Sequence, residues 1–125
     1  MKVSPGMKFN DIQDEDPLPV YMALAKAISP LGLAYLHVMR TGIGAEVALR
    51  PGFEGTLLVG GGFLKEEANK TLESGVADAI VFGVPYLANP DLARRFETDA
   101  ALNAPDPSTF YTPGAKGCTD YPILG

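Results

Sequence analysis

The chain has little cysteine, no long apolar run and no excess of basic residues. Its single cysteine, Cys118, excludes an internal disulfide and a cysteine-based metal site, and it favours a reducing, cytoplasmic compartment. The net charge of −5 argues against a nucleic-acid-binding surface, which needs a basic stripe. No apolar run reaches the roughly 18 residues of a membrane span, and no signal-peptide pattern follows Met1. We therefore expect neither nucleic acid nor a membrane as a partner.

What is present is an alternation of apolar runs and amphipathic segments within 125 residues. The apolar runs predict strands over residues 33–39, 56–59 and 79–82. Lys2-Val3 is a strand fragment that we expect to have no partner of its own. Helical periodicity predicts helices over 18–29 and 65–74, and a last helix after residue 89. This alternation is typical of a parallel sheet in an α/β fold.

Capping residues mark the predicted helix limits. Asp16 followed by Pro17 predicts the N-cap and first position of the first helix. Asn89 followed by Pro90 predicts the same arrangement for the last helix, whose Arg94-Arg95 pair we expect to face solvent. From residue 103 onward the chain is rich in proline and glycine, so we expect an irregular tail.

Glycine follows two successive predicted strands, as Gly60-Gly61-Gly62 and as Gly83. In a (β/α)8 barrel the loops after strands 7 and 8 often bind phosphate, and glycine lets backbone N–H groups approach an anion. The pair of loops therefore predicts a phosphate-binding cup, although the triple glycine alone is also explained by a tight turn between a strand and a helix.

The predicted elements are too few for a complete barrel, which takes about 250 residues. We therefore expect residues 1–125 to form one partial barrel domain, with no separate second domain. The few strands would leave open sheet edges and uncovered apolar faces, so a complementary piece is expected.

These motifs resemble the C-terminal part of the Old Yellow Enzyme family, the FMN-dependent ene-reductases. The resemblance covers nearly the whole chain and rests on the order and spacing of several motifs: Lys2-Val3-Ser4-Pro5, VGGGF at 59–63, ADAIVFG at 77–83, LANPDL at 87–92, Phe110-Tyr111 and Asp120-Tyr121-Pro122. It implies the C-terminal portion of a (β/α)8 TIM barrel, from the end of strand 5 through helix 8 plus the tail, completed by another chain.

The resemblance implies FMN as cofactor and gives site roles to residues of this chain. Backbone N–H groups of Gly60, Gly61 and Gly62 and of the next loop, Gly83 and Val84, would bind the FMN phosphate. Lys2 would stand beside the flavin's pyrimidine edge, where the family usually has an arginine; lysine keeps the charge but loses the planar two-pronged donor. Phe110 and Tyr111 would line the flavin and substrate pocket. Val84 departs from the family, which commonly has a phosphate-binding arginine there.

The resemblance also implies that the catalytic residues lie elsewhere. In the family, the substrate-binding His/Asn pair and the proton-donating tyrosine precede the position of Lys2, so we expect no catalytic residue in this chain. Assembled with a complementary N-terminal barrel fragment, it would reduce activated alkenes such as enones and enals, with NAD(P)H as hydride donor. The alternatives are a non-enzymatic half-barrel that self-associates, and another phosphate-binding barrel with the same cup.

Other polar residues have an ordinary structural explanation beside a functional one. His37, the one histidine, is expected to be a hydrogen-bonded barrel residue and not a catalyst. Arg40 and Thr41 follow a predicted strand, where a structural ion pair or a substrate-loop contact competes with a catalytic role. The acidic residues 11–16 predict a solvated loop and no metal site, because nothing fixes them in a ligand geometry.

Overall fold

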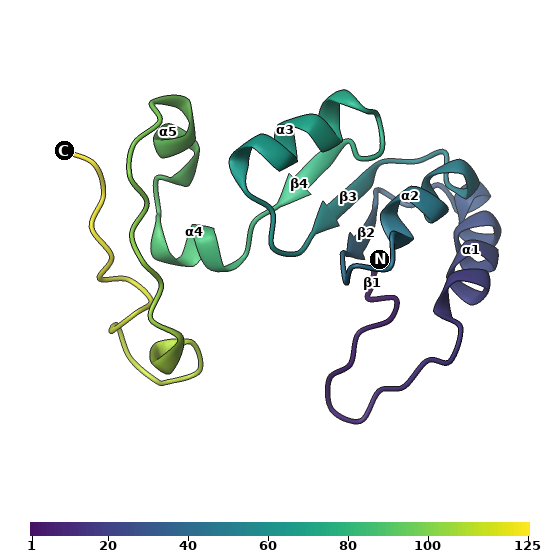
Figure 1. Cartoon of the computed structure of the whole chain (residues 1–125), viewed down its shortest axis with the longest axis horizontal. Helices are drawn as coiled ribbons and strands as arrows, with labels where there is room; N and C mark the ends of the chain where they lie inside the picture. Colours follow the sequence, from purple (N-terminus) through teal and green to yellow (C-terminus); the bar gives the residue numbers. More distant parts are fainter. The chain divides into compact units, whose positions relative to one another are not determined.

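The computed structural model describes the whole chain, residues 1–125. It divides into two compact units, Met1–Val81 and Phe82–Gly125, which are described separately. The first unit contains the strands and the helices between them, and the second contains short helices and the tail (Figure 1). No helix in either unit combines the length and the apolar character needed to cross a membrane.

The strands of the first unit form one parallel sheet, and this confirms the predicted α/β class. The sheet has the order β1 (Lys2–Val3), β2 (Leu36–Met39), β3 (Leu57–Gly60), β4 (Ala79–Val81). The expectation that β1 has no partner is wrong. Lys2 lies opposite His37 and Val3 opposite Val38, and the His37 N–H donates to the Met1 carbonyl at 2.8 Å. Two residues are enough because β2 offers a parallel edge already held by β3.

Three helices connect the strands of this unit: α1 (Pro17–Ile28), α2 (Ala45–Leu49) and α3 (Lys65–Glu73). Short 3-10 turns follow α1 at Ser29–Leu31 and α2 at Arg50–Gly52. Asp16 stands at the N-cap of α1 and Pro17 is its first residue, as predicted, although the Asp16 side chain makes no capping hydrogen bond. A cap residue bonds the N–H of the second or third helical residue, and the third is Pro19, which has no N–H.

The core of the first unit lies on one face of the sheet. Leu36, Val38, Leu57 and Val59 alternate along β2 and β3 and are each at most 1% exposed. Their cover comes from helix and turn residues that are also buried: Ala25, Ile28, Ala45, Leu49, Phe53 and Ala68. Each large aliphatic side chain buried in this way contributes about 1.5–3 kcal/mol. The helices and this face of the sheet therefore hold each other in place.

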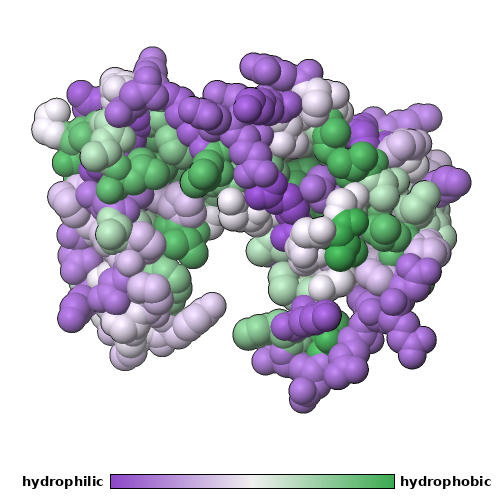
Figure 2. Space-filling view, in the orientation of Figure 1, coloured by the Kyte–Doolittle hydropathy of each residue, from purple (hydrophilic) through white to green (hydrophobic).

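The opposite face of the sheet has less cover. Its residues are Lys2, which is exposed, and His37, Met39, Leu58 and Ala79, which are only partly buried. The edge strands β1 and β4 each have a neighbour on one side only. Figure 2 shows that hydrophobic residues also reach the molecular surface, and the large exposed ones of this unit include Val20, Leu31 and Leu64. The chain's own helices cover one face of the sheet and leave the other face partly exposed.

The second unit contains α4 (Val84–Ala88), α5 (Leu92–Glu97) and a 3-10 turn at Pro107–Thr109. Asn89 is the C-cap of α4 and does not begin the next helix. The prediction of Asn89 as the N-cap of the last helix is therefore wrong. Its Nδ2 donates to the Pro85 carbonyl at 2.9 Å, and its Oδ1 accepts from the Asn103 N–H at 2.7 Å. A 1% exposed asparagine with these partners is part of the core, and Asp91 takes the N-cap position of α5.

Arg95 contradicts the expectation that it faces solvent, whereas Arg94 is exposed as predicted. Arg95 is 5% exposed and donates to the Asp91 carboxylate at 2.8 Å. It also donates to the carbonyls of Ala101 at 2.5 Å and Pro122 at 2.9 Å. These bonds attach the irregular tail to α5. The local sequence did not predict this, because the two carbonyls come from distant residues.

Candidate functional site

The loop that follows β3 requires glycine at successive positions. Gly61 has φ +120° and Gly62 has φ +67°, a region that residues with a side chain rarely adopt. A Cβ on Gly61 would lie 2.7 Å from the Arg40 carbonyl oxygen, and one on Gly60 would lie 2.9 Å from His37 Nε2. The triple glycine therefore serves the local backbone geometry and the close approach of β2.

Arg40 is the side chain that fixes this loop. It directly follows β2, and its N–H donates to the Gly60 carbonyl at 2.6 Å. Its Nε donates to the Gly61 carbonyl at 3.1 Å, and its two terminal nitrogens bind both carboxylate oxygens of Glu67, at 2.5 and 3.2 Å. The guanidinium carbon lies 3.9 Å from the ring centre of Phe63. Of the roles considered for Arg40, the structure shows the ion pair.

The remaining backbone donors of the loop are free for a ligand. The hydrogen bonds of the chain include none from the N–H of Gly61 or of Gly62. The loop leads into α3, whose first turn begins at Lys65. Free N–H groups before a helix N-terminus suit an anion, because the helix dipole adds partial positive charge.

The second glycine loop belongs to the second unit. Gly83 comes directly before α4, and its carbonyl accepts from the Leu87 N–H at 3.0 Å. Val84 is the first residue of that helix and is 42% exposed. Its apolar side chain cannot pair with a phosphate, so only backbone donors are available here. That the two loops form one cup stays a prediction.

Lys2 and His37 lie opposite each other on the less covered face of the sheet. Burial of the ring, followed by the nearby charges of Lys2 and the N-terminus, lowers the pKa of His37, so the imidazole is neutral at pH 7. Its Nε2 is buried and has no hydrogen-bond partner, which contradicts the expected hydrogen-bonded role at that atom. Lys2 is exposed on the same face, and its predicted place beside a flavin stays a prediction.

The two predicted pocket residues of the tail are not enclosed by this chain. Tyr111 is 98% exposed and Phe110 is partly buried. Their role in lining a flavin and substrate pocket stays a prediction.

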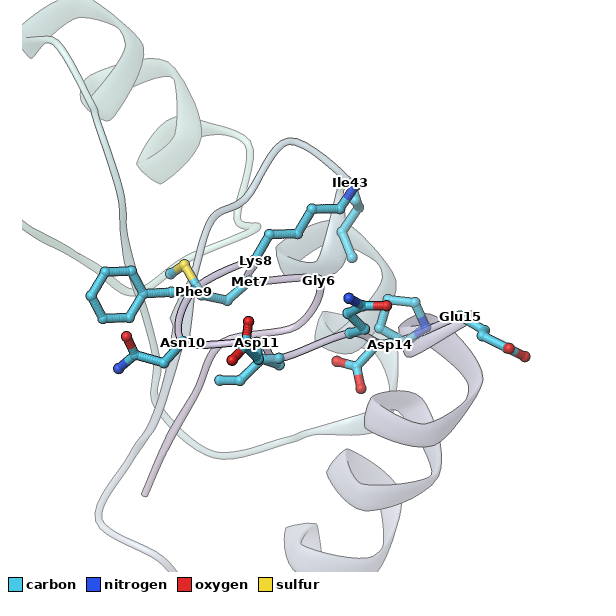
Figure 3. A pocket seen from close by; sticks show the side chains of 12 residues that line it. Gly6, Met7, Lys8, Phe9, Asn10, Asp11, Asp14, Glu15 and Ile43 are labelled. Atoms are coloured by element: carbon cyan, nitrogen blue, oxygen red, sulfur yellow. The ribbon is translucent and has the colours of Figure 1, made fainter.

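The acidic loop is exposed, and its carboxylates do not converge. Asp11, Asp14 and Glu15 are among the residues that line an open pocket with Lys8 and Ile43 (Figure 3). Nowhere in the chain are three or more histidine, cysteine, aspartate or glutamate residues placed to hold a metal ion.

Sequence reasoning missed Glu67 and Phe63 as partners of Arg40. Glu67 lies 27 positions after Arg40, so no local spacing indicates the pair. The available signal was that Arg40 follows one strand, while Phe63 and the first turn of the next helix, which contains Glu67, follow the neighbouring parallel strand. The arginine contact, followed by its charge, lowers the pKa of Glu67, although burial opposes this shift.

Known proteins match the chain over nearly its whole length, although no protein-family model matches it. A "probable flavin mononucleotide-dependent alkene reductase" of Leishmania infantum is 44% identical over 129 residues. A "12-oxophytodienoate reductase-like protein" of Solanum lycopersicum is 41% identical over 128 residues. Each match covers 99% of this chain and 35% of the relative.

Solved structures give the same result. Morphinone reductase in complex with tetrahydroNAD matches with a TM-score of 0.90 and 38% identity, over 99% of this chain and 35% of that one. The old yellow enzyme from Trypanosoma cruzi matches with a TM-score of 0.92 and 35% identity, over 99% and 34%. The chain thus spans about a third of the length of its relatives. Over its whole length, the chain is a homologue of part of the alkene reductases of the Old Yellow Enzyme family.

Proposed function

We propose that this chain is the FMN-phosphate-binding part of an ene-reductase that reduces activated C=C bonds. The observation that carries the proposal is the match of the entire chain, glycine loop included, to proteins described as an FMN-dependent alkene reductase and as morphinone reductase. The complex of morphinone reductase with tetrahydroNAD supports NAD(P)H as the hydride donor.

The residues of the chain fit an FMN phosphate. The free N–H groups of Gly61 and Gly62 would be anion donors, on a loop where a Cβ at Gly61 would clash with the Arg40 carbonyl. Gly83 and Val84 follow β4, the neighbour of β3 in the sheet, and would add donors from the next loop. Lys2 would place a positive charge beside the flavin ring, where it stabilises negative charge. Phe110 and Tyr111 would line the flavin and substrate pocket.

When bound, FMN supplies the hydride chemistry between the nicotinamide and the alkene. The residues of this chain bind and orient the cofactor, and no residue here is proposed to give a proton to the substrate. The substrate-binding His/Asn pair and the proton-donating tyrosine that the family uses would come from the remainder of the barrel.

The remainder of the barrel is proposed to be a complementary chain that carries the other strands. The uncovered face of the sheet and the open edges at β1 and β4 support this, because apolar strand faces and free edges need partners. A barrel closes these edges, and an enclosed face excludes water from the flavin.

The experiment is purification of this chain alone and together with a complementary barrel fragment taken from a homologous ene-reductase. The measurements are the flavin absorbance spectrum, the intact mass of every chain present and oxidation of NAD(P)H with an enone. We expect the assembly to be yellow, to contain both chains and to reduce the enone, and the chain alone to be colourless and inactive.

Two results would contradict the proposal. A stable yellow monomer of this chain alone would show that it needs no complement. A colourless, discrete dimer that the complement does not alter would support the alternative, a half-barrel that closes its edges with a second copy.

A further inference from the structure

We infer that Arg40 is a positioning residue for phosphate binding, acting through the peptide between Gly61 and Gly62. This inference rests on the proposed function and adds a residue to it. Arg40 itself would not contact the phosphate. It would set the direction of the Gly62 N–H, and that N–H would contact the phosphate.

The planarity of the peptide bond carries the first step. In a trans peptide the carbonyl of one residue and the N–H of the next point in opposite directions. The Nε of Arg40 binds the Gly61 carbonyl at 3.1 Å, so the Gly62 N–H of the same peptide points away from Arg40. Both flanking residues are glycines with positive φ, and nothing in their own side chains limits rotation of this peptide. An external contact is needed to hold it.

The guanidinium is itself held by two other residues, and the backbone beside it is fixed as well. Glu67 accepts from both terminal nitrogens, and Phe63 stacks against the guanidinium face at 3.9 Å. The backbone N–H of Arg40 donates to the Gly60 carbonyl. Phe63 is 4% exposed, so the stacked ring is a fixed part of the core. Bidentate pairing with a carboxylate and stacking on a ring both depend on the planar fork of arginine. Lysine keeps the charge but not this geometry.

The same contacts argue against a direct role for Arg40 at the phosphate. Its terminal nitrogens are occupied by Glu67, and the carboxylate neutralises the charge. Glu67 lies in the first turn of α3, beside the loop. If its carboxylate were not paired with Arg40, its negative charge would repel an anion bound there. The ion pair therefore has two effects: it fixes the Arg40 guanidinium, and it neutralises the charge of Glu67.

The test compares binding of FMN with binding of riboflavin, which lacks the phosphate, in the assembled protein. The variants are Arg40→Gln, Arg40→Lys and Glu67→Gln. The control is Arg50→Gln. Arg50 likewise pairs with a carboxylate, Asp78, and donates to the carbonyls of Phe53 and Gly55, but it lies before β3 and not after it.

For the test variants we expect the Kd of FMN to rise about tenfold, the value of one charge-assisted hydrogen bond, and the Kd of riboflavin to change less than about twofold. Arg50→Gln should lower stability without changing the ratio of the two Kd values. Because Glu67 is half exposed, Glu67→Gln gives an answer even if the Arg40 variants do not fold.

Three outcomes would overturn the inference. If the unaltered protein prefers FMN over riboflavin and the Arg40 and Glu67 variants keep that preference, the loop holds its geometry without them. If Glu67→Gln tightens FMN binding, Arg40 contacts the phosphate directly. If the unaltered protein binds both flavins equally, the phosphate loop of the proposed function fails, and the role of Arg40 fails with it.

Discussion

Arg95→Met is the substitution whose cost the structure defines most clearly. Methionine keeps an unbranched stem and a similar volume but removes every donor. Arg95 is 5% exposed, and its three partners are the Asp91 carboxylate and the carbonyls of Ala101 and Pro122. The change therefore separates the hydrogen bonds of a buried arginine from its packing.

The loss of stability on Arg95→Met depends on which acceptors keep another hydrogen-bond donor. The Pro122 carbonyl still accepts from Asn103 Nδ2 at 2.8 Å, and the Asp91 carboxylate still accepts from the Leu124 N–H at 2.8 Å. The Ala101 carbonyl loses its charged donor. A bond to a charged donor is worth about 1.5–3 kcal/mol, so the loss should be about 2 kcal/mol and not the sum of three such bonds.

The assay is urea unfolding of the assembled protein, with hydrogen exchange at the Leu124 amide as a local readout. Arg94→Met is the matched control, because Arg94 is the exposed neighbour on the same helix. Exposed substitutions usually change stability by less than about 0.5 kcal/mol. We expect Arg95→Met to destabilise the protein and to speed exchange at Leu124. Equal effects of the two substitutions would refute the reasoning that Arg95 holds the tail on α5.

Three further changes test other parts of the structure. Gly61→Ala should abolish retention of FMN by the assembled protein, measured as flavin absorbance per protein, because φ +120° and the 2.7 Å approach to the Arg40 carbonyl exclude a side chain; full retention would contradict the loop geometry. Val84→Arg should tighten FMN binding by about tenfold and leave riboflavin unchanged, since it adds a charge-assisted donor. The hydrogen bond from the Leu57 N–H, with that from Arg50, lowers the pKa of Asp78, so its contribution to stability is present above about pH 4 and is lost as the pH falls through the folded-state value. Asp78→Asn should therefore flatten the acid limb of stability against pH, and an unchanged slope would place the acid sensitivity elsewhere.

The strands of the sheet were predictable from the sequence because each is a short apolar run between polar or glycine-rich segments. Their order and parallel direction followed from the helices between them. The strand ends moved by at most three residues, as with β2, which begins at Leu36 where the apolar run begins at Leu33. A run of apolar residues shows what is buried, but the ladder of hydrogen bonds decides where the strand begins.

The errors arose where distant residues act on a local pattern. Asn89-Pro90 has the composition of a helix start, yet the bond from Asn103 makes Asn89 part of the core at the end of α4. Arg95 has the composition of a solvent-exposed residue, yet carbonyls from the tail surround it. Composition and periodicity contain no information on which residues 14 to 27 positions away return to a helix.

The glycine loop was found from sequence because its requirement is local. Tolerance of the positive φ observed at Gly61 and Gly62 is a property of glycine itself. The contacts of Arg40 were not found, because Glu67 meets it only when β2 and β3 are paired and α3 has formed. Glycine alone gives a flexible loop. The surrounding fold has to supply the rigidity that binding an anion requires.

The uncovered face of the sheet connects folding to the proposed site. Helices of this chain cover the side that contains Val38 and Val59, whereas His37 lies on the other side with its Nε2 buried and unpartnered. An unpartnered buried nitrogen destabilises the fold until a donor or acceptor reaches it. In the proposed assembly, the strands that would supply such a partner are the same ones that would enclose the flavin beside Lys2. Completion of the core and formation of the cofactor site should therefore occur together, and the isolated chain should gain stability from the complementary strands before it gains any from FMN.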